Sequence, residues 1–156
     1  MPFKSQPYTG NFYGRPADGV NPNLTVFATF KNGKIDGNFV AWWTKNGQKA
    51  ISTTYINGKQ NGINTFWANN GAKMSEATYK DDKENGIETV YYPTGQKMWV
   101  AIFVDDDIRK KTWWYDNGKK LSEETYKNDK LNGVRTSWNE NGDKTTETYV
   151  DGELVK

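Results

Sequence analysis

The chain has 156 residues, about the length of one domain, and only 35% of them are hydrophobic although 15% are aromatic. It contains 21 basic and 19 acidic residues, for a net charge of +2, and it has no cysteine and no histidine. This composition excludes disulfides, thiolate nucleophiles, imidazole bases and nearly every transition-metal site. The balanced charge also disfavours a nucleic-acid partner. We therefore expect a protein that binds without cofactor or metal, and not an enzyme.

The first 29 residues contain several glycines and prolines and fit the later repeat poorly. We predict that residues 1–29 form an amino-terminal cap, which a repeat array needs. This segment carries no apolar run of signal-peptide length, and no later segment is long enough to span a membrane. The sequence therefore predicts a cytoplasmic location.

From residue 30 onward the sequence repeats with a period of about 24 residues. The frame is set by glycines spaced 24, 24, 23 and 24 residues apart, namely Gly47, Gly71, Gly95, Gly118 and Gly142. A lysine stands two residues after each, at Lys49, Lys73, Lys97, Lys120 and Lys144. An aromatic residue stands four before each, at Trp43, Trp67, Tyr91, Trp114 and Trp138. A second ring follows eight residues after the first four of these glycines, at Tyr55, Tyr79, Phe103 and Tyr126. Residues 30–156 thus hold five to six repeats within a single domain.

Nine Asn-Gly pairs occur along the chain. A type I′ hairpin turn needs positive φ at both central residues, which Asn tolerates and Gly adopts freely. We expect each pair to mark a chain reversal between two antiparallel strands. The predicted fold is all-β: tandem antiparallel hairpins in an elongated, twisted sheet or open solenoid. A lone hairpin is marginal in water, so we expect the two columns of rings to stack between units as the core.

The repeat, aromatic-x-x-x-Gly-x-Lys followed by Tyr-x-x-Gly-Lys and Asn-Gly, resembles the bacterial MORN repeat variant from about residue 30 to the end. The chain is similar to the YwqK-type antitoxin family, which is built almost wholly of such hairpins. That resemblance implies neutralisation of a toxin by protein–protein binding.

Strand parity indicates where a partner would bind, because neighbouring side chains on a strand point to opposite faces. If Trp43, Trp67 and Trp114 pack inward, the residues beside them point outward. An exposed aromatic stripe is a candidate binding site. The alternative is that both faces are covered locally. The predicted stripe consists of Trp42, Phe66 and Trp113, widened by Tyr92 and Tyr115.

A second candidate is the charged segment after Phe103, which interrupts the repeat and leaves its unit one residue short. In this segment Lys110 stands where other units have the turn glycine. The flanking sequence lacks the glycine and distal glutamate of a calcium loop. We interpret it as a solvated turn or as a charged contact for a partner. Its candidate residues are Asp105, Asp106, Asp107, Arg109 and Lys110.

The repeated lysines would align along the array, where they could meet anionic lipid or protect the strands from aggregation. We therefore keep two functional hypotheses. The first is an antitoxin or immunity-type inhibitor that occludes a partner protein, suspected to be a toxin or effector. The second is a membrane-peripheral or assembly scaffold, which the nearby carboxylates disfavour. An inhibitor that is encoded by a mobile element and acts on another protein machine would bind its partner in the same way. The sequence leaves the oligomeric state open.

Overall fold

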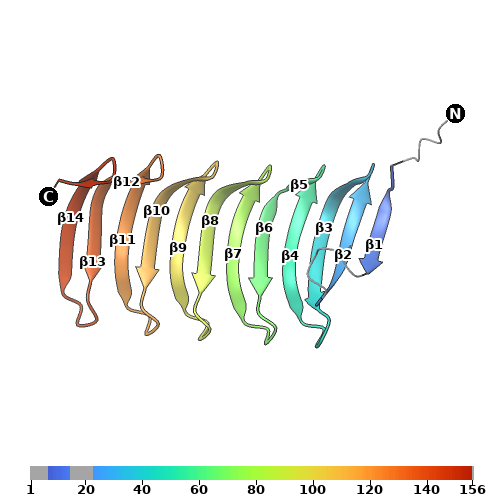
Figure 1. Ribbon diagram of the computed structural model, residues 1–156, viewed down its shortest axis with the longest axis horizontal. Coiled ribbons are helices and arrows are strands. Elements are labelled where there is room, and N and C mark those ends of the chain that lie inside the picture. Colours follow the sequence, from blue (N-terminus) through green and yellow to red (C-terminus); the bar gives the residue numbers. More distant parts are fainter. Residues whose placement is uncertain (1–6, 15–22, 156) are drawn as a thin grey trace.

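The computed structural model describes residues 7–14 and 23–155, and all regular structure in them is β. Fifteen strands form one antiparallel sheet in chain order, except that two short strands pair only with the strand before them (Figure 1). The strands are β1 Gly10–Gly14, β2 Leu24–Lys31, β3 Lys34–Trp43, β4 Lys49–Ile56, β5 Lys59–Gln60, β6 Gly62–Trp67, β7 Lys73–Lys80, β8 Lys83–Tyr91, β9 Lys97–Val104, β10 Asp107–Trp114, β11 Lys120–Lys127, β12 Lys130–Leu131, β13 Gly133–Trp138, β14 Lys144–Val150 and β15 Glu153–Leu154.

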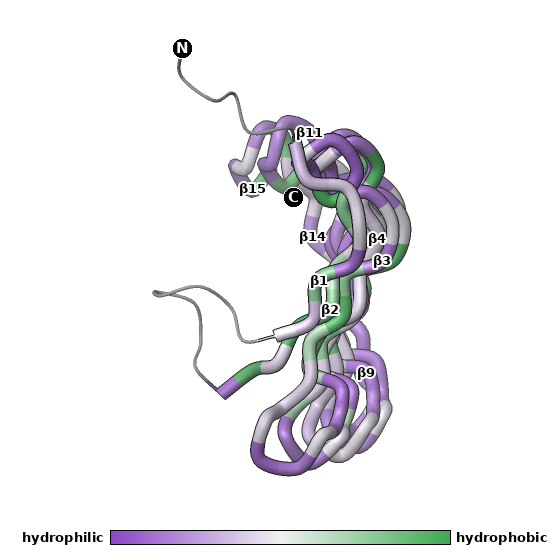
Figure 2. The backbone as a smooth tube through the Cα atoms, turned by 90° about the vertical axis from the view of Figure 1, so that its right-hand side faces the viewer, coloured by the Kyte–Doolittle hydropathy of each residue, from purple (hydrophilic) through white to green (hydrophobic). Residues whose placement is uncertain are grey.

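The elongated hairpin array predicted from the sequence is confirmed. The sheet is open and curves into a crescent when seen along its length (Figure 2). In the described part of the predicted cap, β1 and β2 pair into the same sheet as the repeats. The remainder of that cap lies outside the described residues. No helix within residues 7–14 and 23–155 is long and apolar enough to cross a membrane.

The hairpin turns along the upper edge of Figure 1 have the expected conformation. Asn57 and Gly58 have φ of 54° and 85°, and Asp81 and Asp82 have 53° and 71°, as a type I′ turn requires. Each turn also bonds to the neighbouring unit. For example, the amide of Gly58 donates to Ile35 O at 2.7 Å. The turns therefore close hairpins and join successive units.

The prediction that every Asn-Gly pair reverses the chain is wrong for three of the nine. Asn61-Gly62, Asn85-Gly86 and Asn132-Gly133 lie where a strand continues or resumes, and their glycines have φ of 93°, 128° and 106°. Gly62 lies opposite Tyr79, and Gly86 lies opposite Phe103. Positive φ here bends a strand without reversing it, and glycine adopts this conformation without a steric penalty.

The two ring columns do not form one core, because they lie on opposite faces. Tyr79 shares its face with Ala77 and with Asn64, the cross-strand partner of Ala77. Trp67 pairs with Lys73 beyond a bulge, and its side chain lies on the other face. Within its row Trp67 alternates with lysines, and Lys49 Nζ lies 5.9 Å from its ring centroid. Ring-on-ring stacking of this column between units was therefore a wrong expectation.

Burial in this single layer is concentrated in small side chains. Ala41 and Ala101 have no exposed surface, whereas no large side chain in the described part of the chain is fully buried. The one apolar cluster of buried residues lies at the amino-terminal strands and contains Leu24, Val26, Ala41 and Ala50. Inter-strand hydrogen bonds and half-buried rings therefore hold the array together, as in repeat proteins whose units contact only their neighbours.

Candidate functional site

The sheet presents two chemically different faces. Cross-strand partners share a face, and the pairs Ile51–Phe66 and Trp99–Trp113 place these four side chains on the same side. Residues of this side line two pockets, of about 440 and 390 Å³. Because these pockets hollow this side of the sheet, we call it the concave face. The opposite side is the convex face.

Two residues of the predicted aromatic stripe lie on the concave face. Phe66 is paired with Ile51 and Ser75, and its side chain remains 40% exposed. Trp113 is paired with Trp99 and Ser122.

Trp42 is a correction, because it lies on the convex face. Its partner is Lys49, just as Trp67 pairs with Lys73, so Ala41 has the place that Phe66 has in the next unit. The cause is a longer loop, since the amide of Gly47 donates to the carbonyl four residues back, at Trp43. In the next unit the amide of Gly71 donates only three residues back, to Ala68. Counting from the glycine therefore misplaced Trp42 by one residue.

Tyr92 and Tyr115 each form a hydrogen bond to the next unit. The Tyr92 hydroxyl donates to Trp114 O at 2.9 Å, and the Tyr115 hydroxyl donates to Trp138 O at 3.0 Å. Trp43 occupies the equivalent place, and its Nε1 donates to Trp67 O at 3.2 Å. All three side chains are half-buried, so these positions have a structural role whatever else they contact.

The acidic segment forms a regular hairpin turn. Asp105 and Asp106 have φ of 53° and 74°, like Asp81 and Asp82 one unit earlier. Asp106 Oδ1 accepts a hydrogen bond from the Glu84 amide at 2.7 Å. Asp105 Oδ1 accepts one from the neighbouring unit as well, from Asn85 Nδ2 at 2.9 Å. These carboxylates therefore join two units, and no cluster of metal-ligating side chains occurs among the residues that the structure describes.

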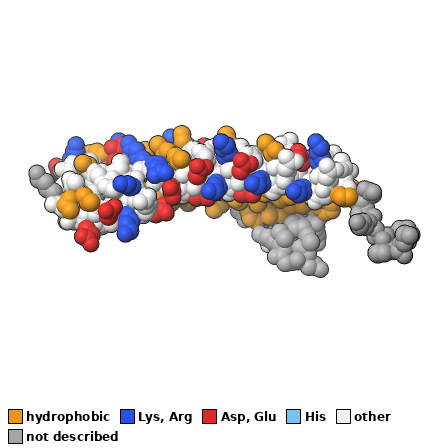
Figure 3. All heavy atoms as spheres, turned by 90° about the horizontal axis from the view of Figure 1, so that it is seen from above, with side chains coloured by type: hydrophobic (Ala, Val, Ile, Leu, Met, Phe, Trp, Pro, Cys, Tyr) orange, Lys and Arg blue, Asp and Glu red, His pale blue; other side chains and the backbone are white. Residues whose placement is uncertain are grey.

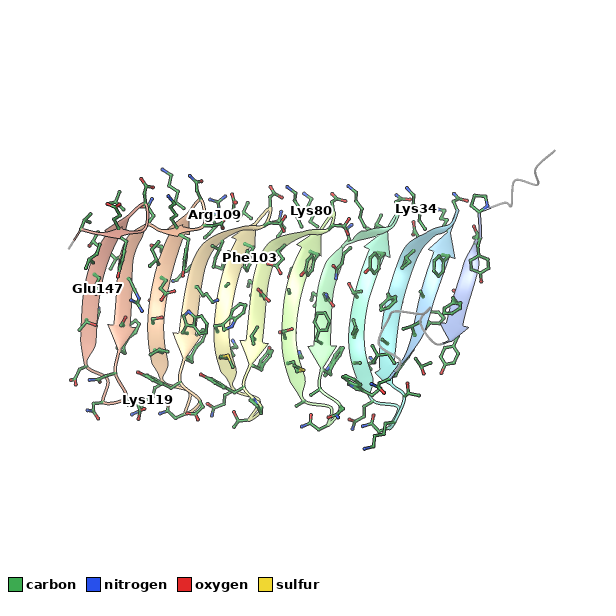
Figure 4. All side chains as sticks on the ribbon, in the orientation of Figure 1. Lys34, Lys80, Phe103, Arg109, Lys119 and Glu147 are labelled. Carbon is green, nitrogen blue, oxygen red and sulfur yellow. The ribbon has the colours of Figure 1, made fainter. Side chains whose placement is uncertain are left out.

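The remaining residues of this segment lie at the upper edge and on the convex face. Arg109 Nη2 forms an ion pair with Asp107 Oδ2 at 3.2 Å, and its side chain stands at the upper edge in Figure 4. Lys110 pairs with Ile102 from one side, as Ile87 does from the other. Lys110 therefore has the position in β10 that Ile87 has in β8. Its predicted equivalence to the turn glycine is therefore wrong. The unit is short by one residue within the strand, so the glycine's place falls on Arg109.

The lysine column lies on the convex face, and two of its five members form ion pairs with glutamates. Lys73 Nζ lies 2.8 Å from Glu76 Oε2 and 5.8 Å from the Tyr91 ring centroid. Lys120 repeats the arrangement, 2.8 Å from Glu123 Oε1 and 5.2 Å from the Trp138 ring. On the upper edge, lysines and acidic side chains are interspersed (Figure 3). Neither surface presents an unbroken positive charge.

Sequence reasoning missed the centre of the concave face. The ring centroids of Trp99 and Trp113 lie 6.0 Å apart. Lys111 Nζ lies 3.9 Å from the first centroid and 4.2 Å from the second, a close cation–π contact with both. Burial lowers the pKa of this amine, against the opposing effect of Glu88 and Glu124. The signal available in the sequence was the parity of Trp99, two residues beyond Lys97.

The concave face next to Trp113 is polar and already ordered. Glu124, only 8% exposed, accepts hydrogen bonds from Tyr126 Oη at 2.7 Å, Ser122 Oγ at 3.1 Å and Arg135 Nε at 3.2 Å. Arg135 also reaches Glu147 Oε2 at 3.5 Å. Burial raises the pKa of the Tyr126 hydroxyl, and its hydrogen bond to Glu124 raises this pKa further. These side chains line the pocket of about 440 Å³ and give it fixed donors and acceptors.

The amino-terminal half of the concave face is apolar instead. Its pocket of about 390 Å³ is lined by Ile51, Phe66 and Met74, with Leu24 and Trp43 beside them. Met74 is 52% exposed. The concave face therefore changes along the array from an apolar hollow to a charged, hydrogen-bonded one, and this gradient can orient an elongated ligand.

The fold defines a class: open, single-layer arrays of β-hairpins with two chemically different faces. The description of the MORN repeat variant matches residues 110–128, which span the end of β10 and β11. No curated protein matches the chain. Among solved structures the chain is similar to one titled "Crystal Structure of TarM", with a TM-score of 0.40 and 10% identity. The match covers 69% of this chain and 21% of that one, so the chain spans about a fifth of its length.

Proposed function

We propose that this protein is a non-catalytic inhibitor that acts in the cytoplasm, in the manner of an antitoxin or immunity protein. It binds a partner protein on its concave face and occludes the partner's working surface. One observation supports the proposal above the others: half-exposed rings and two pockets share the hollow side of an open sheet. Rings in such settings supply most of the energy of protein interfaces.

The mechanism follows from rigidity and from the polarity of the face. Strand pairing and the unit-to-unit bonds of Tyr92 and Tyr115 hold the concave rings in place before binding. Little ordering entropy is then lost on association. The apolar hollow near Phe66 contributes affinity, and the charged row near Trp113 contributes orientation.

Affinity capture from the native host, followed by mass spectrometry, tests the proposal with matched variants. Phe66→Ser and Trp113→Ser remove concave rings. Ile63→Ser removes a 61% exposed apolar residue from the convex face of the same strand as Phe66. We expect the wild type and Ile63→Ser to retain one partner protein that both concave variants lose. With the purified partner, each concave variant should weaken binding by about 30-fold, the equivalent of about 2 kcal/mol.

A scaffold that binds anionic lipid is the competing outcome. Sedimentation with phosphatidylserine vesicles at low and high salt distinguishes the two functions. Salt-sensitive sedimentation of the wild type, together with retention of the same host proteins by Phe66→Ser, would overturn the inhibitor proposal.

A further inference from the structure

One side chain on the concave face has an unused hydrogen-bonding atom. Asn64, on β6, pairs with Ala77 and is only 7% exposed. Its Oδ1 is buried, and within the described parts of the chain it accepts no hydrogen bond. Buried polar atoms are nearly always partnered, because leaving one unpartnered costs free energy. This oxygen therefore lacks a donor that a ligand can supply.

The apolar hollow lies on the same face of the sheet, at the next side chain of this face along β6. Phe66, two residues further along β6, shares the concave face with Asn64 and lines the pocket of about 390 Å³. Ile51 and Ser75 are the cross-strand partners of Phe66 and also line it. Among the residues that the structure describes, no charged side chain lines this pocket. It therefore fits an uncharged apolar group and offers no partner for a charged one.

We propose that the pocket and Asn64 together form an anchor subsite for a partner segment carrying a tryptophan. The indole ring fills the pocket, and the N–H of the indole donates a hydrogen bond to Asn64 Oδ1. Tryptophan combines a large apolar surface with one N–H donor, which is the combination that the two features require. This inference rests on the proposed function and names the chemistry that the concave face recognises.

The commitment to tryptophan follows from complementarity. An aliphatic side chain would fill the hollow but leave Oδ1 unpartnered, whereas a lysine or arginine would place a charge among apolar atoms. Because Oδ1 is buried, engagement requires a side-chain rearrangement on the concave face, of the kind that is common at interfaces.

Two small probes separate the two parts of the subsite. Indole carries the ring and the N–H, and 1-methylindole carries the ring alone. Binding to the full chain is followed by NMR titration of the Met74 and Ile51 methyl groups. We expect both probes to shift these methyls, with indole binding about 3- to 10-fold more tightly, as one net hydrogen bond gives. Phe66→Ser should weaken both probes alike.

Asn64→Leu keeps the side-chain size and removes the acceptor. We expect indole to bind this variant no better than 1-methylindole, while the melting temperature rises because an unpartnered polar atom has been removed. A fall in melting temperature would show that Oδ1 already has a partner and would overturn the proposal. Equal binding of the two probes to the wild type, or unchanged indole preference in Asn64→Leu, would overturn it too.

The experiments distinguish failure of the tryptophan subsite from failure of the proposed function. If the probes are not distinguished but Phe66→Ser still loses the host partner, the tryptophan subsite is wrong and concave-face binding stands. If the probes behave as expected while the concave variants keep every host partner, the subsite stands and the inhibitor proposal fails.

Discussion

Glu88 lies on the concave face of β8, between Ala77 and Ala101 on the neighbouring strands. Burial among these small apolar neighbours, reinforced by the negative charge of Glu84 and opposed by Lys111, raises the pKa of Glu88 to about 7. A glutamate in an unfolded chain has a pKa of about 4.3. The folded protein therefore holds this proton more tightly than the unfolded chain does.

The sign of the pH dependence follows. The contribution of Glu88 to stability is fully present below about pH 4.3, and it is lost as the pH rises towards about 7. Each tenfold difference in proton affinity corresponds to about 1.4 kcal/mol, so the whole difference corresponds to about 4 kcal/mol. Because the side chain is only partly buried, solvent screening reduces this to about 1 kcal/mol.

Glu88→Gln removes the ionisation while keeping the shape. We expect urea unfolding to show the variant about 1 kcal/mol more stable than the wild type at pH 8, with the advantage vanishing near pH 4.5. A constant difference across this range, or none at pH 8, would refute the account of Glu88 as a half-buried carboxyl that resists ionisation.

Glu76 supplies a control of opposite sign on the convex face. Hydrogen bonds from Lys73, at 2.8 Å, and from Tyr91, at 2.8 Å, lower the pKa of Glu76. Its contribution is present above the ordinary glutamate pKa and is lost as the pH falls through the lowered value. Glu76→Gln should therefore be less stable than the wild type at pH 8, and this deficit should shrink on acidification.

Three further substitutions test the packing. Trp67→Ala should lower the free energy of unfolding by about 1–2 kcal/mol, well below the cost of removing a fully buried ring, because Trp67 is half-buried with Lys49 above it. A loss above about 4 kcal/mol in urea unfolding would show an enclosed core instead. Gly86→Ala places a Cβ 3.0 Å from Thr78 Cβ at φ 128° and should cost about 2–3 kcal/mol. Gly62→Ala, at φ 93° with no atom within 4 Å, should cost about 1 kcal/mol, and equal losses in the two variants would contradict the role of the contact.

Much of the fold was predictable because local chemistry determines it. The 24-residue period, the frame glycines and the pairs such as Asn57-Gly58 give turns whose positive φ requires these residues. Strand parity then placed Phe66 and Trp113 together on one face. These conclusions depend on neighbours a few residues apart, which is the range over which sequence patterns are reliable.

The candidate site depended on offsets that the pattern did not reveal. One extra loop residue after Trp43 moved Trp42 to the other face, and one missing residue placed Arg109 where a glycine was expected. A shift of one residue exchanges the faces of a strand. For the same reason, an Asn-Gly pair at a bulge looks like one at a reversal until its strand partners are known.

By itself, the sequence determined that the chain is a β-hairpin repeat array, because the turns and the alternation of strands are local properties. Only the tertiary structure decided that the two ring columns lie on opposite faces. It also brought Lys111 over Trp99 and Trp113, and among the described residues it left Asn64 Oδ1 without a donor on the face that carries the apolar hollow. These features arise from bulges and cross-strand register, which set the face of each side chain through hydrogen bonds between strands.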